Sequence, residues 1–291
     1  MAWLQLRVHS RYPEFVDEIL QAAGASAVSF IDAEDDPVLE PLPGETPLWT
    51  HTVTLGLFPE MHDFAPTLSA LREQLPDGDD IKIETELVED QDWVRVWLKD
   101  CPPLKFGTRL WVCPHEKRVD EPGTVTLLLD PGLAFGTGTH PSTALCLEWL
   151  ATHEVDGWSV LDYGCGSGIL AIAALKLGAA SAVAYDIDPQ AIQATLANAA
   201  ANGVADRLTT VAPELAVTPF PADLVLANIL ARPLIDLAPL LASTIRPGGW
   251  IVLAGLLDRQ ADDVRGAYAP WFDFAPEGKR EGWTRLAARR R

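Results

Sequence analysis

Long apolar runs, paired cysteines and positive charge are all scarce in this 291-residue sequence. The longest apolar runs, such as residues 169–175, are far shorter than the roughly 20 residues that span a bilayer. The chain starts at Met1 without the basic and apolar stretches of a secretory signal peptide. We therefore expect a cytoplasmic protein with no membrane partner.

The four cysteines stand alone in the sequence, with no C-x-x-C pair and no histidine at metal-ligand spacing. They are Cys101, Cys113, Cys146 and Cys165. This pattern predicts reduced thiols, with neither a disulfide framework nor a metal site.

Lysine and arginine number 22 against 41 aspartates and glutamates, which gives a net charge of −19. Such a chain repels polyanions, so a nucleic-acid substrate is not favoured. Residues 1–100 hold six of the basic and 21 of the acidic residues, a net charge of −15. Two interpretations stay open for this acidic third: a solvated surface, or a face that docks a basic partner.

The length predicts two domains. In residues 1–91 the apolar patterns predict the order β-α-β-β-α-β of a ferredoxin-like α+β domain. The expected strands are 3–8, 27–31, 52–58 and 81–87, and the expected helices are 13–23 and 63–75. Residues 92–103 have the pattern of a short amphipathic linker helix, ended by Pro102 and Pro103.

Residues 104–291 alternate strand-like and helical runs, the signature of an α/β fold with a doubly wound parallel sheet. Strands are expected at 160–162, 182–185, 208–211, 224–227 and 250–254. Helices are expected near 144–150, 169–177, 189–202 and 233–244. The end of the chain, 272–287, has the pattern of an antiparallel hairpin.

A glycine-rich turn, DYGCGSG at residues 162–168, joins the first of these strands to a helix. Glycines let a ligand approach the backbone and the amides of the helix N-terminus. Residue 169 is Ile and no Walker lysine follows, so neither the dinucleotide nor the phosphate-binding fingerprint is present. Tight packing between strand and helix is the alternative explanation of the turn.

Asp186 ends the next strand, at the position of an acceptor for two ribose hydroxyls. An adenosyl ligand with a small carboxylate end satisfies both features. Asn228 ends the fourth parallel strand, where it either faces the ligand crevice or makes a local turn.

The loop at residues 129–143 is dense in glycine and hydroxyl groups and leads into a helix. Thr139 or His140 suits the cap of that helix, and Pro141 suits its first turn. His140 has two interpretations, as a cap or as a proton acceptor. Phe135 also has two, as a packing residue or as an aromatic face for the cofactor or a substrate ammonium.

The glycine turn with Asp162 and Asp186 resembles that of class I S-adenosylmethionine-dependent methyltransferases. Segments 130–143, 162–173, 186–189 and 228–230, with 41–49 in the first domain, resemble the ribosomal protein L11 methyltransferase family, PrmA. The resemblance covers essentially the whole chain. It implies a seven-stranded class I domain at 104–291 and a substrate-recognition domain at 1–91.

The resemblance further implies methyl transfer from S-adenosyl-L-methionine to the N-terminal α-amine and lysine ε-amines of free ribosomal protein L11. The family's cofactor contacts correspond to Thr143, Gly164, Asp186 and Asn228, and the turn itself adds Gly166. Methyl transfer from a sulfonium is an in-line displacement that needs alignment and exclusion of water. A neutral acceptor suits the reacting amine better than a carboxylate, so we expect Asn228 to be catalytic by orienting the amine.

Two other functions compete with this interpretation. A nucleic-acid exocyclic-amine methyltransferase typically carries Asn or Asp, two prolines and an aromatic residue that stacks on an extruded base, whereas Ile229, Leu230 and Ala231 follow Asn228 here. The other is a cofactor-binding interaction protein of the translation machinery, which an activity assay separates from an enzyme.

Overall fold

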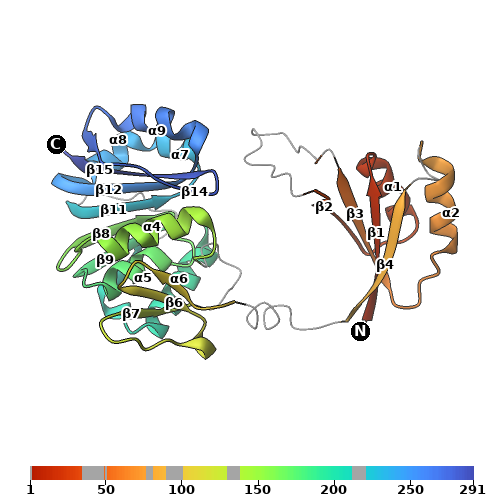
Figure 1. Ribbon diagram of the computed structural model, residues 1–291, viewed down its shortest axis with the longest axis horizontal. Coiled ribbons are helices and arrows are strands. Elements are labelled where there is room, and N and C mark those ends of the chain that lie inside the picture. Colours follow the sequence, from red (N-terminus) through yellow and green to blue (C-terminus); the bar gives the residue numbers. More distant parts are fainter. Residues whose placement is uncertain are drawn as a thin grey trace. The chain divides into compact units, whose positions relative to one another are not determined.

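The computed structural model describes residues 2–34, 49, 51–76, 81–89, 101–129, 138–211 and 221–291. The chain forms two compact units, Met1–Asp92 and Trp93–Arg291 (Figure 1). Most of the predicted linker helix at 92–103 lies outside the described residues, and residues 101–103 have no regular secondary structure.

The N-terminal unit is a four-stranded antiparallel sheet in the order β2-β3-β1-β4 with two helices. Its elements are β1 (Ala2–Ser10), α1 (Pro13–Ala22), β2 (Ala27–Asp32), β3 (Thr52–Pro59), α2 (Ala65–Gln74) and β4 (Lys82–Glu89). Side chains alternate along β1, so Leu6 and Val8 are fully buried in a core that includes Leu20 and Leu71 from the helices. This confirms the ferredoxin-like fold.

The C-terminal unit contains an eight-stranded sheet in the order β10-β9-β8-β11-β12-β15-β13, with β14 beside β15. Its strands are β8 (Ser159–Tyr163), β9 (Ser181–Tyr185), β10 (Leu208–Val211), β11 (Ala222–Asn228), β12 (Ile245–Leu257), β13 (Phe272–Phe274), β14 (Gly278–Arg280) and β15 (Trp283–Arg290). Strands β8 to β12 pair in parallel, and β15 is antiparallel to β12. The seven-stranded, doubly wound sheet is confirmed, with the short β14 as an addition. Since β8 lies between β9 and β11, the strand order reverses there and opens a crevice at the carboxyl ends.

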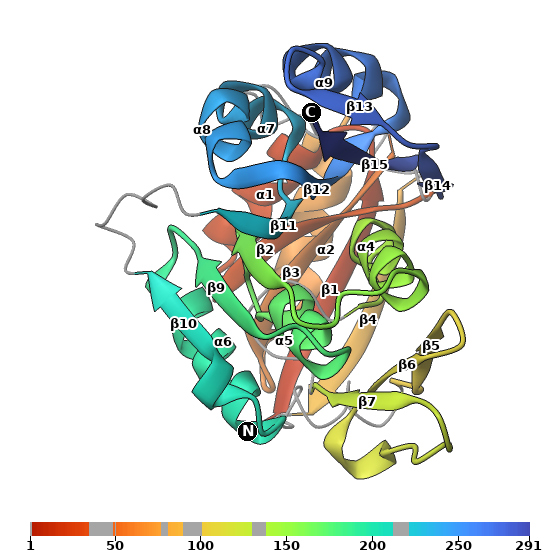
Figure 2. The same cartoon turned by 90° about the vertical axis from the view of Figure 1, so that its left-hand side faces the viewer.

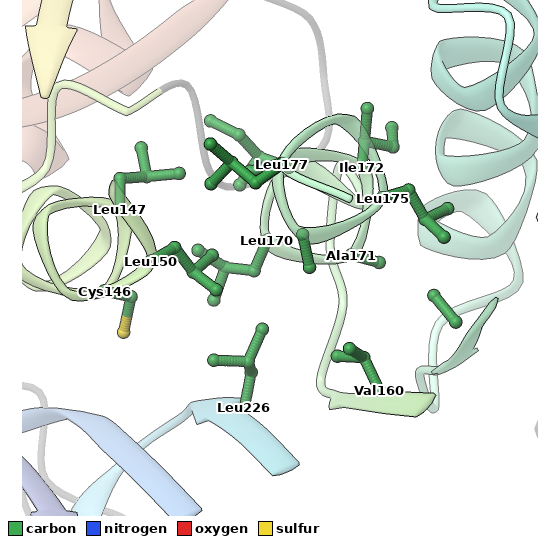
Figure 3. Packing of buried hydrophobic residues seen from close by; sticks show 14 of the residues in the cluster. Cys146, Leu147, Leu150, Val160, Leu170, Ala171, Ile172, Leu175, Leu177 and Leu226 are labelled. Atoms are coloured by element: carbon green, nitrogen blue, oxygen red, sulfur yellow. The ribbon is translucent and has the colours of Figure 1, made fainter. Parts of the chain in front are cut away.

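Helices cover both faces of this sheet (Figures 1 and 2). They are α4 (Pro141–Thr152), α5 (Ile169–Lys176) and α6 (Pro189–Ala201) on one face, and α7 (Ala231–Asp236), α8 (Ala238–Ser243) and α9 (Ala261–Tyr268) on the other. Figure 3 shows Leu147 and Leu150 of α4 beside Leu170 of α5, close to Val160 and Leu226 of the sheet. Both faces of the strands are therefore buried, as their continuous apolar runs indicate.

Three features of this unit differ from the sequence expectations. The single helix expected at 233–244 is divided into α7 and α8 at Leu237, because Pro239 has no N–H group and its ring conflicts with a continuous helix. Helix α9 and a separate three-stranded sheet were not expected. That sheet consists of β5 (Leu104–Phe106), β6 (Leu110–Cys113) and β7 (Val125–Leu128), and its residues join the core beneath α4 and α5.

In the described part of the chain, no helix is long and apolar enough to cross a membrane.

Candidate functional site

The turn after β8 is built on left-handed glycines. Gly164, Gly166 and Gly168 have φ values of +78°, +53° and +77°, a region that side chains disfavour. The amides of Gly164 and Cys165 both donate to the carbonyl oxygen of Tyr185, at 2.8 and 3.0 Å. A Cβ atom on residue 164 would also overlap Cγ2 of Ile229. Tight packing is therefore a real requirement of the turn, alongside any ligand that approaches it.

Helix α6 holds this turn from the side. Thr195, fully buried, donates from Oγ1 to the carbonyl oxygen of Gly166 at 3.1 Å and lies 3.3 Å from Sγ of Cys165. Asn198 donates from Nδ2 to the carbonyl oxygen of Ser167 at 2.8 Å. Neither residue was identified from the sequence, because bonds that span about thirty residues leave no local pattern.

Asp186 links the end of β9 to the turn. Its Oδ2 accepts from the amide of Gly166 at 2.9 Å, and its Oδ1 accepts from the amide of Asp188 at 3.0 Å. Asp188 in turn caps α6 by accepting from Gln190. Each carboxylate oxygen can accept a second hydrogen bond, so the half-buried Asp186 is fixed in place and still able to bind hydroxyl groups.

Asp162 is fully buried beneath the turn. Its Oδ2 accepts from the amide of Ala171 in α5 at 2.9 Å. Its Oδ1 has no hydrogen-bond partner among the described residues. Burial raises the pKa of Asp162 to about 7, the bond from Ala171 opposes that rise, and the charge of Asp186 adds to it.

Asn228, at the end of β11, contacts Thr143, which lies in the first turn of α4. Nδ2 of Asn228 donates to Oγ1 of the fully buried Thr143 at 3.0 Å. This contact spans 85 residues, so Asn228 does not serve a local turn through it. Oδ1 of Asn228 is buried without a hydrogen-bond partner in the described part of the chain. With its nitrogen donating to Thr143, the amide of Asn228 leaves its oxygen as an acceptor.

A cavity of about 350 Å³ adjoins Asn228. It is lined by His140, Ser142, Asn228, Ile229, Leu230, Gly255 and Trp283. The ring of Trp283 meets that of His140 edge-on, with 4.7 Å between centroids. His140 accepts from the amide of Ser142 and caps α4, which confirms the capping role. Burial lowers the pKa of His140, and nearby Glu281 opposes that shift.

Trp283 and Gly255 were not identified from the sequence. Trp283 begins β15, which only the folded sheet brings beside α4. Gly255 has a φ of +81° within β12, and a Cβ there would lie 2.5 Å from the carbonyl oxygen of Ile229. A glycine inside an apolar strand is a signal of such close approach. Residues 130–137, including Phe135, lie outside the described residues, as do residues 41–48.

The carboxyl ends of β8, β9 and β11 thus bring together a glycine turn, Asp186 and Asn228. With this strand order, the arrangement is that of a class I S-adenosylmethionine-dependent methyltransferase. Within the described part of the chain, no group of three or more His, Cys, Asp or Glu side chains is placed to hold a metal ion.

The model of the family described as "Ribosomal protein L11 methyltransferase (PrmA)" matches residues 2–291, and the chain belongs to this family. A ribosomal protein L11 methyltransferase of Aeromonas salmonicida is 48% identical over 292 residues, covering 100% of this chain and 99% of the relative. That of Shewanella amazonensis is 46% identical over 293 residues, with the same coverage. A crystal structure of ribosomal protein L11 methylase from Lactobacillus delbrueckii subsp. bulgaricus matches with a TM-score of 0.60 and 33% identity, covering 66% of this chain and 100% of that one.

Proposed function

We propose that this chain methylates the N-terminal α-amine and lysine ε-amines of free ribosomal protein L11 in the cytoplasm, with S-adenosylmethionine as donor. Family membership and the names of relatives that match along their whole length support the protein substrate. The observation that best supports methyl transfer is the position of the Asn228 amide, which donates to Thr143 and lines a cavity.

The described residues fit an adenosyl sulfonium cofactor. Gly164 and Gly166 present backbone without side chains at the crevice, and Asp186 has acceptor capacity for ribose hydroxyls. The unpartnered Oδ1 of Asn228 gives a further polar contact, with Thr143 holding the amide. When bound, the cofactor supplies a methyl group made electrophilic by a positively charged sulfur. We assign Thr143, Gly164, Gly166, Asp186 and Asn228 to its binding.

The reacting amine has to arrive without its proton. A lysine ammonium has a pKa of about 10.4 and an α-amino group one of about 7.7 to 8.0, so both need help at neutral pH. Transfer into a largely apolar cavity lowers an amine's pKa, whereas an adjacent carboxylate would raise it. Oδ1 of Asn228 is a neutral acceptor, so it orients the N–H groups while stabilising the ammonium less than a carboxylate would.

His140 is better suited to fixing α4 than to accepting the amine's proton. Its Nδ1 accepts from the amide of Ser142, at 3.3 Å, so in the neutral ring the proton is on Nε2. A nitrogen that carries a proton donates rather than accepts. We therefore assign His140 a capping role and a place in the wall of the cavity, and expect the amine to release its proton to water.

The test uses the purified chain, isotopically labelled cofactor, and either free ribosomal protein L11 or ribosomal RNA as acceptor. We expect label in the protein and none in the RNA. Label in RNA alone would transfer the proposal to a nucleic-acid methyltransferase, and cofactor binding with no label in either would indicate a non-enzymatic binding protein.

A further inference from the structure

We infer that the groove between α1 and α2 of the N-terminal unit docks a basic, amphipathic segment of the protein substrate. The inference rests on the proposed function for the existence of that substrate, and it concerns where the substrate is held rather than where it reacts. The groove has a volume of about 560 Å³. Residues of the N-terminal unit alone line it.

The shape of the groove suits the apolar side of an inserted helix or extended segment. Its floor is formed by Ile19 and Thr67, which are 7% and 3% exposed. The walls are small residues, Ala22, Ala23 and Ala70, so the helices leave a channel where larger side chains would close it. A helix or extended segment placed there buries apolar surface on both helices.

An exposed aromatic ring lies at the same place. Phe15 lines the groove and is 56% exposed, although it belongs to a helix whose Val16 and Leu20 are fully buried. Single exposed apolar residues are ordinary, but one that adjoins an apolar channel enlarges a continuous patch. Aromatic residues in such patches commonly anchor protein partners.

The charge at the groove selects a basic partner. Glu18 and Asp63 line it, and no lysine or arginine is among its described lining residues. The described ion pairs of this unit involve Glu34 and Glu84 and not Glu18, so the charge of Glu18 remains available. The net charge of −15 over residues 1–100 adds long-range attraction for a basic partner.

The opposite face of the same sheet is different. There Glu84 lies between cations, 2.8 Å from Nζ of Lys82 and 3.8 Å from Nε of Arg7. Charges that neutralise one another give little attraction to an outside cation. The groove therefore combines an apolar channel with acidic side chains that make no ion pair among the described residues.

The experiment compares three variants of the full chain in steady-state methylation of ribosomal protein L11. Glu18→Lys and Phe15→Ala alter the groove, and Glu86→Lys makes the same charge change at an exposed residue on the opposite face of the sheet. We expect the two groove variants to raise KM for L11 by about tenfold, with kcat and KM for the cofactor unchanged. Glu86→Lys should change KM by less than about twofold, because it leaves the docking face intact.

Two results would overturn the inference while the proposed function stands. Equal KM increases in Glu18→Lys and Glu86→Lys would show that net charge, and not the groove, attracts the substrate. Unchanged KM in both groove variants would show that the substrate does not bind in the groove. A native chain that dimerises and loses this association in Phe15→Ala would assign the groove to a second copy instead. If the native chain transfers no methyl group to L11, the proposed function itself fails.

Discussion

At the residue scale, the proposed chemistry depends on the orientation of the Asn228 amide. Asn228 is held at its nitrogen by Thr143, and its oxygen has no partner among the described residues. A buried acceptor left without a partner is costly, which is why such groups occur mainly where a ligand completes them. In the proposed mechanism, this unpartnered oxygen orients the amine without a charged residue.

Replacing Asn228 tests this orientation. We expect Asn228→Ala to lower kcat by about 100-fold or more, as loss of one preorganised group at a reaction centre does. Asn228→Asp keeps the size but adds charge, so its residual activity should shift to higher pH as the carboxylate raises the amine's pKa. Rate measurements across pH with cofactor binding measured in parallel check this, and full transfer by Asn228→Ala with unchanged cofactor affinity contradicts it.

The buried Asp162 makes the stability of the protein depend on pH. Burial raises its pKa to about 7 from an ordinary value of 3.8. Between these values the folded protein keeps a proton that the unfolded chain has released, so stability falls as pH rises through this window and levels off above about 7. Asp162→Asn removes this dependence.

The free energy of unfolding of Asp162→Asn should therefore rise relative to that of the native chain as the pH increases. We expect this difference to grow by about 2 to 3 kcal/mol from pH 5 to pH 8. Denaturant unfolding of both proteins without cofactor, at several pH values, measures the difference. A difference that is constant with pH would show that the carboxyl does not titrate in this range.

At the element scale, the parts of the fold that follow from local pattern were predictable. The helix 13–23 and the strands at 52–58 and 160–162 were expected from alternation, spacing and capping residues, and the structure has α1, β3 and β8 there. The division of α7 from α8 at Leu237 was missed because Pro239 lies inside an otherwise helical pattern. Sequence reasoning also missed the wall of the cavity. Trp283 reaches His140 only through the pairing of β15 with β12, a contact that no local spacing records.

The glycine turn gives a prediction at this scale. Gly164→Ala forces a side chain into a left-handed backbone and into the space of Ile229. Gly157→Ala is the matched control, because Gly157 has a similar φ of +73° but nothing within 4 Å of the added Cβ. We expect a loss of about 1 kcal/mol for Gly157→Ala from strain alone, and at least about 2 kcal/mol for Gly164→Ala.

Gly164→Ala should also weaken cofactor binding, since Ile229 follows Asn228 directly in the crevice. Calorimetric titration with the cofactor and chemical unfolding separate the two effects. Equal losses of stability in both variants, with native cofactor affinity in Gly164→Ala, would show that close packing at the turn is unimportant.

At the scale of the whole molecule, the proposed substrate recognition and the proposed methyl transfer belong to two compact units with separate cores. Leu6, Val8 and Leu71 belong to a cluster within Met1–Asp92, whereas the sheet that carries Asn228 has clusters of its own. The excess of negative charge is also concentrated in the first hundred residues. Substrate affinity and the methyl-transfer step should therefore respond to different conditions.

A change in ionic strength separates substrate affinity from the methyl-transfer step. Raising salt from about 0.05 to 0.5 M shortens the range over which exposed charges attract a basic protein. We expect KM for ribosomal protein L11 to rise several-fold while KM for the cofactor stays constant, because Asp186 and Asn228 act at hydrogen-bond distance. A KM for L11 that does not depend on salt would assign the acidity of residues 1–100 to solvation alone.

The most direct test of the whole account is intact-mass and peptide mass spectrometry of free ribosomal protein L11 after incubation with the chain and labelled S-adenosylmethionine. We predict mass increases in multiples of one methyl group, placed on the N-terminal α-amine and on lysine side chains, and abolished with Asn228→Ala. An unmodified L11, or methyl groups on side chains other than amines, would contradict it.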